Sequence, residues 1–505
     1  MSVLTNALAE ALTPLAEYVP LLTVAWVALP FSIGFSIYLL PQYDRILALG
    51  VTLVSTLYAA LVIVGQTPQT FELLGSFGVT LAIDDLGSYF ILTNALVTLA
   101  VLMYCWRTEK PDFFYTQVIL LHGSVNSAFL CADFISLYVA LEVLGVASFL
   151  LVTYTRSAKS IWIGLRYLFV SNTAMLFYLV GTALVYRATN SFQFQGLADS
   201  PPEAIALIFL GLSVKGGIFV SGLWLPQTHS QAESPVSAML SGVVVKTAVL
   251  PLVRCALLVP EVEPIVRLLG VGTALLGVGY AVFEKDSKRM LAFHTVSQLG
   301  FVLAAPLVAG FYALTHGFVK SALFLVAGAL PSRNFKELNK KPIARSLWLF
   351  ATIAAASISG LPLLAGFGAK TLTMKSLLPW QVVAMNVAAV GTAISFAKFI
   401  FLPHSDEIKA PEQVQRLWPA MAILLGGLLI ANGLYPPAYS FANIAKATAT
   451  VAAGWTIYHA IIKRLSVKLP RGPERLEDLL GTMSLTAVGL FLLAIYVFSN
   501  GGYVQ

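Results

Sequence analysis

Residues 212–246 read LSVKGGIFVSGLWLPQTHSQAESPVSAMLSGVVVK, and this stretch decides the architecture of the chain. Its apolar runs are separated by residues that interrupt the backbone hydrogen bonds of a helix, namely Gly216, Gly217, Pro226 and Pro235. Helices broken at membrane depth are tolerated where the freed backbone is buried in protein or lines a water-filled cavity, and transporters use them at their binding sites. The stretch therefore predicts a broken transmembrane helix, with Lys215 just ahead of the break.

The remainder of the chain is equally apolar. Of its 505 residues, 58% are hydrophobic and 11% are charged, and the mean hydropathy is +0.82. Apolar windows long enough to span a bilayer recur about sixteen times. They cover residues 20–40, 45–64, 86–106, 112–131, 133–154, 160–186, 203–224, 236–258, 262–283, 290–309, 311–332, 344–369, 378–403, 417–436, 439–461 and 479–499. The sequence predicts an all-α, polytopic integral membrane protein.

A second interruption lies in SISGLPLLAGFGAK, residues 357–370, where Gly360 and Pro362 precede Lys370. Each interrupted helix would be the fourth in a unit of five spans, so the order of helices predicts two units, at residues 112–258 and 259–403. An odd number of spans per unit makes the two units inverted repeats. We expect N-terminal helices in residues 1–111 and further C-terminal helices in residues 404–505.

Lysine and arginine gather in every second loop. These loops hold Arg107, Lys110, Arg156, Lys159, Lys285, Lys288, Arg289, the run 333–345 and the run 463–475, whereas the loops between them hold only Arg187, Arg267 and Lys375. Cytoplasmic loops carry the excess of basic residues, so both termini are predicted to lie outside the cytoplasm. Topology explains the net charge of +7, and nucleic acid is not an expected partner.

The N-terminal residues 2–18 carry leucines at helical spacing and no basic segment. The absence of a basic segment argues against a cleaved signal peptide. The leucine spacing is typical of an amphipathic helix that lies on the membrane, although a frayed terminus fits the residues equally well.

Motifs for metals and cofactors are missing from the sequence. The cysteines Cys105, Cys131 and Cys255 are isolated, and the histidines show no paired-ligand spacing. No glycine-rich nucleotide loop is present. We therefore expect neither a cofactor nor a metal site.

Eight basic residues fall inside the predicted spans: Arg166, Lys215, Lys246, Arg254, Lys320, Lys370, Lys398 and Lys446. A charge at the centre of a membrane helix costs about 2.5 to 3.5 kcal/mol on insertion scales, so such residues face the interior of the bundle and mark ion or proton paths. Glu142, in LYVALEVLGVASF at residues 137–149, is too far from either end of its span to reach the headgroups. It must be protonated, hydrated or paired with a cation.

Several motifs resemble one known superfamily, over about residues 80–400. They are LEVLGVASFLLV (141–152), KGGIFVSGLWLP (215–226), SPVSAMLSGVVVK (234–246), KRMLAFHTVSQLGF (288–301), HGFVKSALFLVAG (316–328) and SGLPLLAGFGAK (359–370). In this order they resemble the antiporter-like membrane subunits, which include the proton-translocating membrane subunits of complex I and the A and D subunits of Mrp cation/proton antiporters. The chain looks most like the D subunits of the Mrp group.

Two positions depart from the pattern of the superfamily. Gln227 stands where an acidic residue is usual, and Arg166 with Tyr167 stands where the family has a Lys-Tyr pair. The second departure keeps the positive charge, whereas the first leaves the detail of the loop open.

The resemblance implies a core of fourteen helices with broken seventh and twelfth helices, followed by about two extra C-terminal helices. It implies that Glu142 is the glutamate of the fifth helix and that Lys215, Lys246 and Lys370 are the ionisable residues of the seventh, eighth and twelfth helices. His294, His316 and Lys320 fall in two further motifs of the family and would complete a polar axis at the membrane midplane. Lys398 is an exit group or a snorkelling side chain. Residues 437–505 receive no role from the resemblance.

A carboxylate next to a buried lysine makes a proton switch. Two unit charges 4 Å apart interact by about 4 kcal/mol at an effective dielectric constant near 20, so a change at Glu142 would decide whether Lys215 keeps its proton. Histidines titrate near neutrality and can relay protons between lysines. His316, one helical turn before Lys320, fits this role.

The expected function is proton translocation by one subunit of a multi-subunit antiporter that exchanges protons for Na⁺ or another monovalent cation. The protein would lie in a prokaryotic cell membrane among other Mrp-type subunits, and it would not be an enzyme. The alternative is a proton-pumping membrane subunit of a complex I-like NAD(P)H or ferredoxin:quinone oxidoreductase. A membrane scaffold without conduction is a third interpretation, and the run of buried lysines argues against it.

Overall fold

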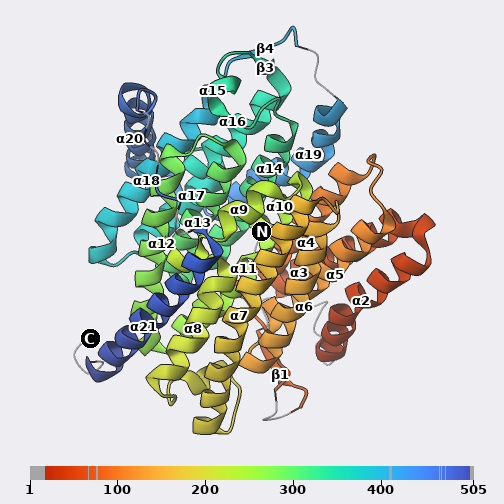
Figure 1. Ribbon diagram of the computed structural model, residues 1–505, viewed down its shortest axis with the longest axis vertical. Helices are drawn as coiled ribbons and strands as arrows, with labels where there is room; N and C mark the ends of the chain where they lie inside the picture. Colours follow the sequence, from red (N-terminus) through yellow and green to blue (C-terminus); the bar gives the residue numbers. More distant parts are fainter. Residues whose placement is uncertain are drawn as a thin grey trace.

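The computed structural model describes residues 18–65, 68–74, 78–408, 412–465, 467, 469–471 and 474–500. The chain is almost entirely helical (Figure 1). The helix considered for residues 2–18 lies outside the described residues, which begin at Tyr18.

The N-terminal part contributes three long helices and a small hairpin. The helices are α2 (Val19–Leu39), α3 (Asp44–Gly65) and α4 (Asp85–Cys105). Between α3 and α4, β1 (Gln69–Glu72) pairs antiparallel with β2 (Thr80–Ile83), with Gln69 opposite Ile83.

Residues 112–258, called the first segment below, hold the first broken helix. The elements are α5 (Asp112–Leu130), α6 (Phe134–Thr153), α7 (Ala158–Thr189), α8 (Pro202–Gly216), α9 (Leu225–Gln231), α10 (Ser234–Met239) and α11 (Lys246–Leu258). The short helix η5 (Val220–Gly222) lies within the break between α8 and α9, and η6 (Leu240–Val244) is one π-helical turn between α10 and α11.

Residues 259–403, the second segment, repeat this order of elements. They contain α12 (Glu263–Phe283), α13 (Ser287–Ala304), α14 (Ala309–Ala329), α15 (Phe335–Leu338), α16 (Arg345–Ser359), α17 (Ala365–Lys375) and α18 (Pro379–Ile400). The short strand β3 (Ile343–Ala344) pairs in parallel with β4 (His404–Ser405). Apart from the short α15, the fourth helix of this segment is again the one that is broken, between α16 and α17.

The C-terminal part contains α19 (Glu412–Ala431), α20 (Phe441–Ile457), the π-helical turn η11 (Tyr458–Ile462) and α21 (Leu476–Asn500). The remaining single turns are η2 (Pro41–Tyr43), η4 (Phe194–Leu197), η7 (Pro260–Val262), η8 (Pro306–Val308), η9 (Asn432–Leu434) and η10 (Pro436–Ala438).

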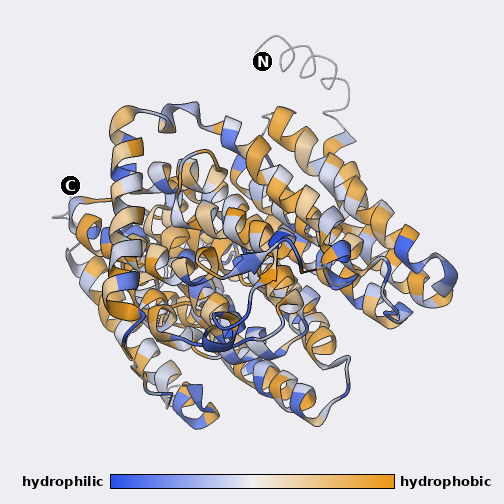
Figure 2. Cartoon of the chain, turned by 90° about the horizontal axis from the view of Figure 1, so that it is seen from above, coloured by the Kyte–Doolittle hydropathy of each residue, from blue (hydrophilic) through white to orange (hydrophobic). Residues whose placement is uncertain are grey.

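The predicted all-α membrane architecture is confirmed. Among the described residues, twelve helices are long and apolar enough to cross a membrane. Figure 2 shows hydrophobic residues along the helices and hydrophilic residues concentrated in the connections. Outward-facing side chains such as Leu21 and Val383 are 68% and 75% exposed, as expected for surfaces that face lipid. The window predicted at 344–369 is two helices, α16 and α17, and the second continues to Lys375.

Both breaks depend on a glycine. Gly217 caps α8 with φ 71°, and Gly360 caps α16 with φ 87°. This left-handed conformation suits glycine because it has no Cβ, and each glycine N–H bonds back to carbonyls of the last helical turn. Pro226 and Pro235 lie at the starts of α9 and α10, where a missing N–H costs nothing.

The helix α14 lies at the centre of the bundle. It packs against α4, α10, α13, α16, α17 and α19, and nearly all its residues are buried. At one end of the bundle, basic residues from alternate loops line a shared cavity of about 680 Å³: Lys159, Lys285, Arg289, Arg333 and Arg471. Four of the connections expected on one side of the membrane thus contribute basic residues to one cavity.

Candidate functional site: a row of buried basic side chains

The basic side chains predicted to form an axis are all buried. Their exposed fractions lie between 0% and 8% for Lys215, Lys246, His294, His316, Lys320, Lys370 and Lys398. They come from α8, α11, α13, α14, α17 and α18. Because burial of an unpaired charge is costly, the contacts of each ammonium group show how the fold holds it.

Lys215 lies in the last turn of α8, just before the break. Its Nζ donates a hydrogen bond to the hydroxyl of Ser171 on α7, at 2.7 Å. The same Nζ lies against α6, because a Cβ built on Gly145 would be 2.9 Å from it. The negative end of the α8 dipole also favours a positive charge at this position.

Glu142 is on α6, one turn before Gly145, and its charge acts on Lys215. The two groups do not form an ion pair within 4 Å, and one carboxylate oxygen of Glu142 is buried without a hydrogen-bond partner. Val139, Val143 and Val146 on the same helix are exposed. Glu142 therefore lies near Lys215 but is not locked to it.

Lys246 opens α11, immediately after the π-helical turn. Its Nζ donates to the carbonyl of Gly242 within that turn. A Cβ built on Gly317 of α14 would be 3.6 Å from the same Nζ, so Lys246 points at the helix that carries His316. Single π-helical turns occur frequently at functional sites.

The central group consists of His294, His316 and Lys320. Neither ring nitrogen of His294 or of His316 has a hydrogen-bond partner, and Lys320 Nζ donates to the carbonyl of Leu291, one turn before His294. Lys246, Lys320 and His294 lie close enough to His316 for their charges to act on it. His294 is in range of Lys320, Lys370 and Lys398.

A small polar cavity next to His316 was not singled out from the sequence. It measures about 10 Å³ and is lined by Gln298, Tyr312, Thr315 and His316 together with Val319, Ile358 and Gly366. Tyr312 donates to Gln298 at 2.6 Å. The cavity has room for about one water, which would give the unpartnered imidazole a partner.

Lys370 follows the second break and reaches back across it. Its Nζ donates to the carbonyls of Ile358 and Ser359 at 3.2 and 3.3 Å. These carbonyls belong to the last turn of α16, the negative end of that helix. Lys370 also lines a cavity of about 200 Å³ beside α20, with Lys375 and Lys446.

Lys398 on α18 is held by three carbonyls at the end of α12. Its Nζ donates to the oxygens of Ala281, Val282 and Glu284 at 3.2, 2.8 and 2.8 Å. It also lines a cavity of about 110 Å³ with Tyr458, Leu465 and Val467. Backbone carbonyls therefore hold Lys398 at the end of the bundle where the basic loops meet.

The structure sorts the predicted residues into two sets. Lys246, His316, Lys320, His294, Lys370 and Lys398 form one electrostatically connected group, whereas Glu142 and Lys215 form a separate pair. Within the described part of the chain, no group of three or more His, Cys, Asp or Glu could hold a metal ion. Such a row can exchange protons between amines, imidazoles and intervening water.

Two neighbours of the row could not be identified from the sequence. Ser171, the acceptor for Lys215, is one serine among many in the spans. His229 on α9 is fully buried and lies within range of Lys320. The polar run QTHSQAES that follows the first break was the available hint.

Comparisons with known proteins match this architecture. Residues 131–395 match the family model described as NADH:quinone oxidoreductase/Mrp antiporter, TM. The D subunit of the Na⁺/H⁺ antiporter of Alkalihalophilus pseudofirmus is 28% identical over 78% of this chain and 88% of its own length. The N subunit of the NADH-quinone oxidoreductase of Desulforudis audaxviator is 31% identical over 64% of this chain and 72% of its own length.

A solved structure shows the same fold. It is a chain of an archaeal membrane-bound sulfane sulfur reductase, a respiratory membrane complex, with a TM-score of 0.73 and 23% identity. The match covers 87% of this chain and 99% of that chain.

Proposed function

The chain belongs to the transmembrane family of NADH:quinone oxidoreductase and Mrp antiporter subunits, and from this premise we propose that it moves protons as one subunit of a monovalent cation/proton antiporter. The resemblance to antiporter-like subunits stated from the motifs is thereby confirmed. The relatives are themselves subunits, which supports a role inside a larger membrane complex.

The observation that carries the proposal is the row of seven buried basic side chains. If these side chains served only as structural ion pairs, each would need an acidic partner. The ammonium groups of the row are held instead by hydroxyl and carbonyl oxygens. These neutral acceptors hold a proton without fixing it in an ion pair. We assign protons to this row, and not Na⁺, because fixed ammonium charges repel a cation.

Glu142 and Lys215 are proposed as the switch. The carboxylate acts on Lys215 without an ion pair, so a small movement of either group would change the proton affinity of the lysine. His294, His316 and Lys320 are proposed as the relay between Lys246 and the two groups Lys370 and Lys398. The division into two inverted units at residues 112–258 and 259–403 is part of the same proposal, and the shared order of elements supports it.

The face where the basic loops meet is proposed to be cytoplasmic in a prokaryotic cell membrane, with both termini on the opposite side. The excess of basic residues in alternate loops supports this orientation. The partners would be the other subunits of an Mrp-type complex, the lipid bilayer, protons and Na⁺ or another monovalent cation, with no cofactor in this chain.

The test uses membrane vesicles that contain the complete complex encoded with this subunit. ΔpH-driven Na⁺/H⁺ exchange is compared among wild type, Glu142→Gln, Lys215→Ala and the control Lys340→Ala, an exposed loop residue, at matched levels of assembled complex. We expect both site variants to lose exchange by at least about 100-fold and the control to match wild type. Wild-type exchange in both site variants would contradict the proposal.

A second function is supported by the relative that is the N subunit of an NADH-quinone oxidoreductase. In that case a redox reaction in partner subunits would drive the same row, and the chain would be part of an enzyme complex. Proton pumping on addition of a reductant, without sodium-dependent exchange, would favour this function over the antiporter.

A further inference from the structure

The C-terminal part of the chain links the two segments at the end of the bundle where the basic loops meet. Helix α20 packs against α18 of the second segment, and α21 packs against α8 of the first. The connection between them, residues 463–475, is called the strap here, and its described residues are 463–465, 467, 469–471, 474 and 475. No role for residues 437–505 followed from the sequence.

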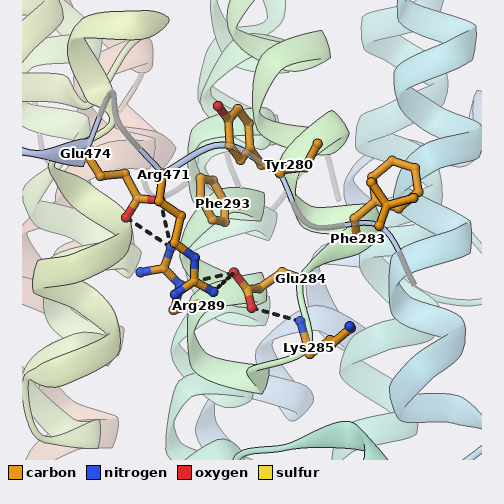
Figure 3. A pocket seen from close by; sticks show the side chains of 10 residues that line it. Tyr280, Phe283, Glu284, Lys285, Arg289, Phe293, Arg471 and Glu474 are labelled. Carbon is orange, nitrogen blue, oxygen red and sulfur yellow. Dashed lines mark hydrogen bonds and ion pairs between the residues drawn. The ribbon is translucent and has the colours of Figure 1, made fainter. Parts of the chain in front are cut away.

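The strap inserts one buried carboxylate into the bundle. Glu474 is 2% exposed and lies beside Arg289 of α13, as Figure 3 shows. Arg289 Nη2 donates to both carboxylate oxygens of Glu474, at 2.7 and 3.0 Å. The geometry is a charge-assisted pair in which one nitrogen serves both oxygens.

The backbone of Glu474 serves a second arginine. Arg166 Nη2 of α7 donates to the carbonyl oxygen of Glu474, and Arg166 Nε has no partner. Arg166 and Arg289 are each 8% exposed. One strap residue therefore holds a buried arginine from each segment.

Arg289 connects Glu474 to Lys398 through Glu284. Arg289 Nε donates to Glu284 at 3.1 Å, and the backbone carbonyl of Glu284 accepts from Lys398. Burial raises the pKa of Glu284, but the backbone N–H of Asp286 and the Arg289 guanidinium outweigh it and hold the pKa below its usual value. A line of contacts thus runs from Arg166 through Glu474, Arg289 and Glu284 to Lys398.

The other end of this line lies on α7, the helix that also carries the hydrogen-bond acceptor of Lys215. Arg166 lies on α7, five positions before Ser171, which accepts from Lys215. The charge of Glu474 also acts on Arg166. Buried arginines without a counter-charge are strongly unfavourable, so loss of the Glu474 carboxylate would leave excess positive charge at the end of the bundle that holds Lys398.

We propose that Glu474 is a positioning residue for proton transfer at Lys398 of the second segment, acting through Arg289 and Glu284, and that it ties α7 of the first segment to this site through Arg166. The inference rests on the proposed function, because it concerns the rate and pH dependence of the same proton movement. The proposal assigns a role to the C-terminal helices, because α20 precedes the strap and α21 follows it.

The charged and titratable groups that face Glu474 decide the direction of its effect. They are Arg166 on α7, Arg289 on α13, Tyr280 on α12, Glu284 and Lys285 in the loop after α12, and Arg471 of the strap. Replacement of Glu474 by a neutral side chain makes this end more positive. Protonated lysines nearby are then less favourable, and the pH of half-maximal exchange moves to lower values.

The experiment compares Glu474→Gln with Glu474→Asp and the control Glu477→Gln, which removes an exposed carboxylate one turn away. Exchange is measured against pH in vesicles with the whole complex, per assembled complex, and thermal stability is measured in parallel. We expect Glu474→Gln to lower exchange about tenfold and to shift its pH profile, because one charge-assisted hydrogen-bond partner is lost. Glu474→Asp restores part of the rate, and Glu477→Gln behaves as wild type.

Unchanged rate and pH profile in assembled Glu474→Gln would overturn the inference, as would a loss of stability alone with a normal profile. If the Glu474 variants do not assemble, Arg289→Lys decides, because it keeps the charge but loses the guanidinium fork. A wild-type profile in Arg289→Lys overturns the inference, and a shifted profile supports it. The variant Lys215→Ala, measured in the same series, tests the proposed function separately. Wild-type exchange in Lys215→Ala would contradict the proposed function, whatever the result for Glu474→Gln.

Discussion

The two broken helices hold their lysines in opposite ways. Lys215 precedes its break and donates to a side-chain hydroxyl, with the carboxylate of Glu142 acting from the next helix. Lys370 follows its break and donates to two backbone carbonyls of α16. A hydroxyl can rotate and a carboxylate can change charge, whereas helix carbonyls are fixed dipoles. We infer that the first lysine is the adjustable one and that the second has a constant proton affinity.

Both lysines share one physical feature. Lys215 belongs to the last turn of α8, and the ammonium group of Lys370 reaches the last turn of α16; a glycine terminates each of these helices, and the dipole at a helix C-terminus favours a cation. The comparison therefore separates what the two breaks have in common, a helix end, from what differs, the charge and mobility of the acceptor.

The largest effect is expected when each lysine loses the ability to release its proton. Lys215→Arg and Lys370→Arg keep the positive charge, but arginine stays protonated. Exchange in complex-containing vesicles should fall at least about 100-fold in both variants. If Lys370→Arg kept wild-type exchange, the second break would not lie on the path and the comparison would fail.

A smaller effect should distinguish the two sites. Ser171→Ala removes the side-chain acceptor of Lys215, and the cost of about 1–3 kcal/mol for an unmade buried hydrogen bond penalises the protonated lysine. The pH of half-maximal exchange should fall by about one unit. Ser359→Ala keeps the carbonyl that binds Lys370 and serves as the matched control. Equal shifts in both variants would remove the distinction between adjustable and fixed acceptors.

The glycines at the breaks should matter for stability. Gly217→Ala and Gly360→Ala place a Cβ at φ 71° and 87°, and a non-glycine residue there costs about 1–2 kcal/mol. Both should lower the thermal unfolding temperature of the purified complex. Gly360→Ala should also lower exchange, because its Cβ would be 3.0 Å from Lys370 Cδ. The control Gly426→Ala has open space around the new Cβ.

The smallest effect is expected at the cavity beside α20. Lys446 lines this cavity with Lys370 but is exposed, and exposed charges contribute about 1 kcal/mol or less. Lys446→Gln should change exchange less than about fivefold, and the change should disappear at high salt. A larger, salt-independent loss would make Lys446 part of the path at the second break.

The fold was largely predictable from the sequence because its signals are local. Apolar windows predicted the helices, and Gly217 and Gly360 predicted the two interruptions before any contact was known. The buried lysines were conspicuous for the same reason, since a charge within an apolar window stands out.

The contacts of those lysines were not predictable. Lys370 and Lys398 are held by backbone carbonyls. Every residue has such a carbonyl, so the sequence does not indicate which ones bind the lysines. Ser171 is unremarkable in sequence, and Glu474 lies in a polar connection yet contacts Arg166, 308 positions away. Such pairings depend on how distant helices pack, which spacing along the chain does not encode.

The π-helical turn at Leu240–Val244 determines how this helix would respond to the loss of one residue. A π turn accommodates one residue more than an α turn would, and each residue of an α-helix adds about 100° of rotation. Because the π turn absorbs this residue within one turn, its deletion would leave a regular α-helical turn and keep Lys246 close to its present direction. It would remove the widened turn whose Gly242 carbonyl accepts from Lys246, so the contact of a proton-carrying group depends on a single residue that the helix could lose without turning its later side chains.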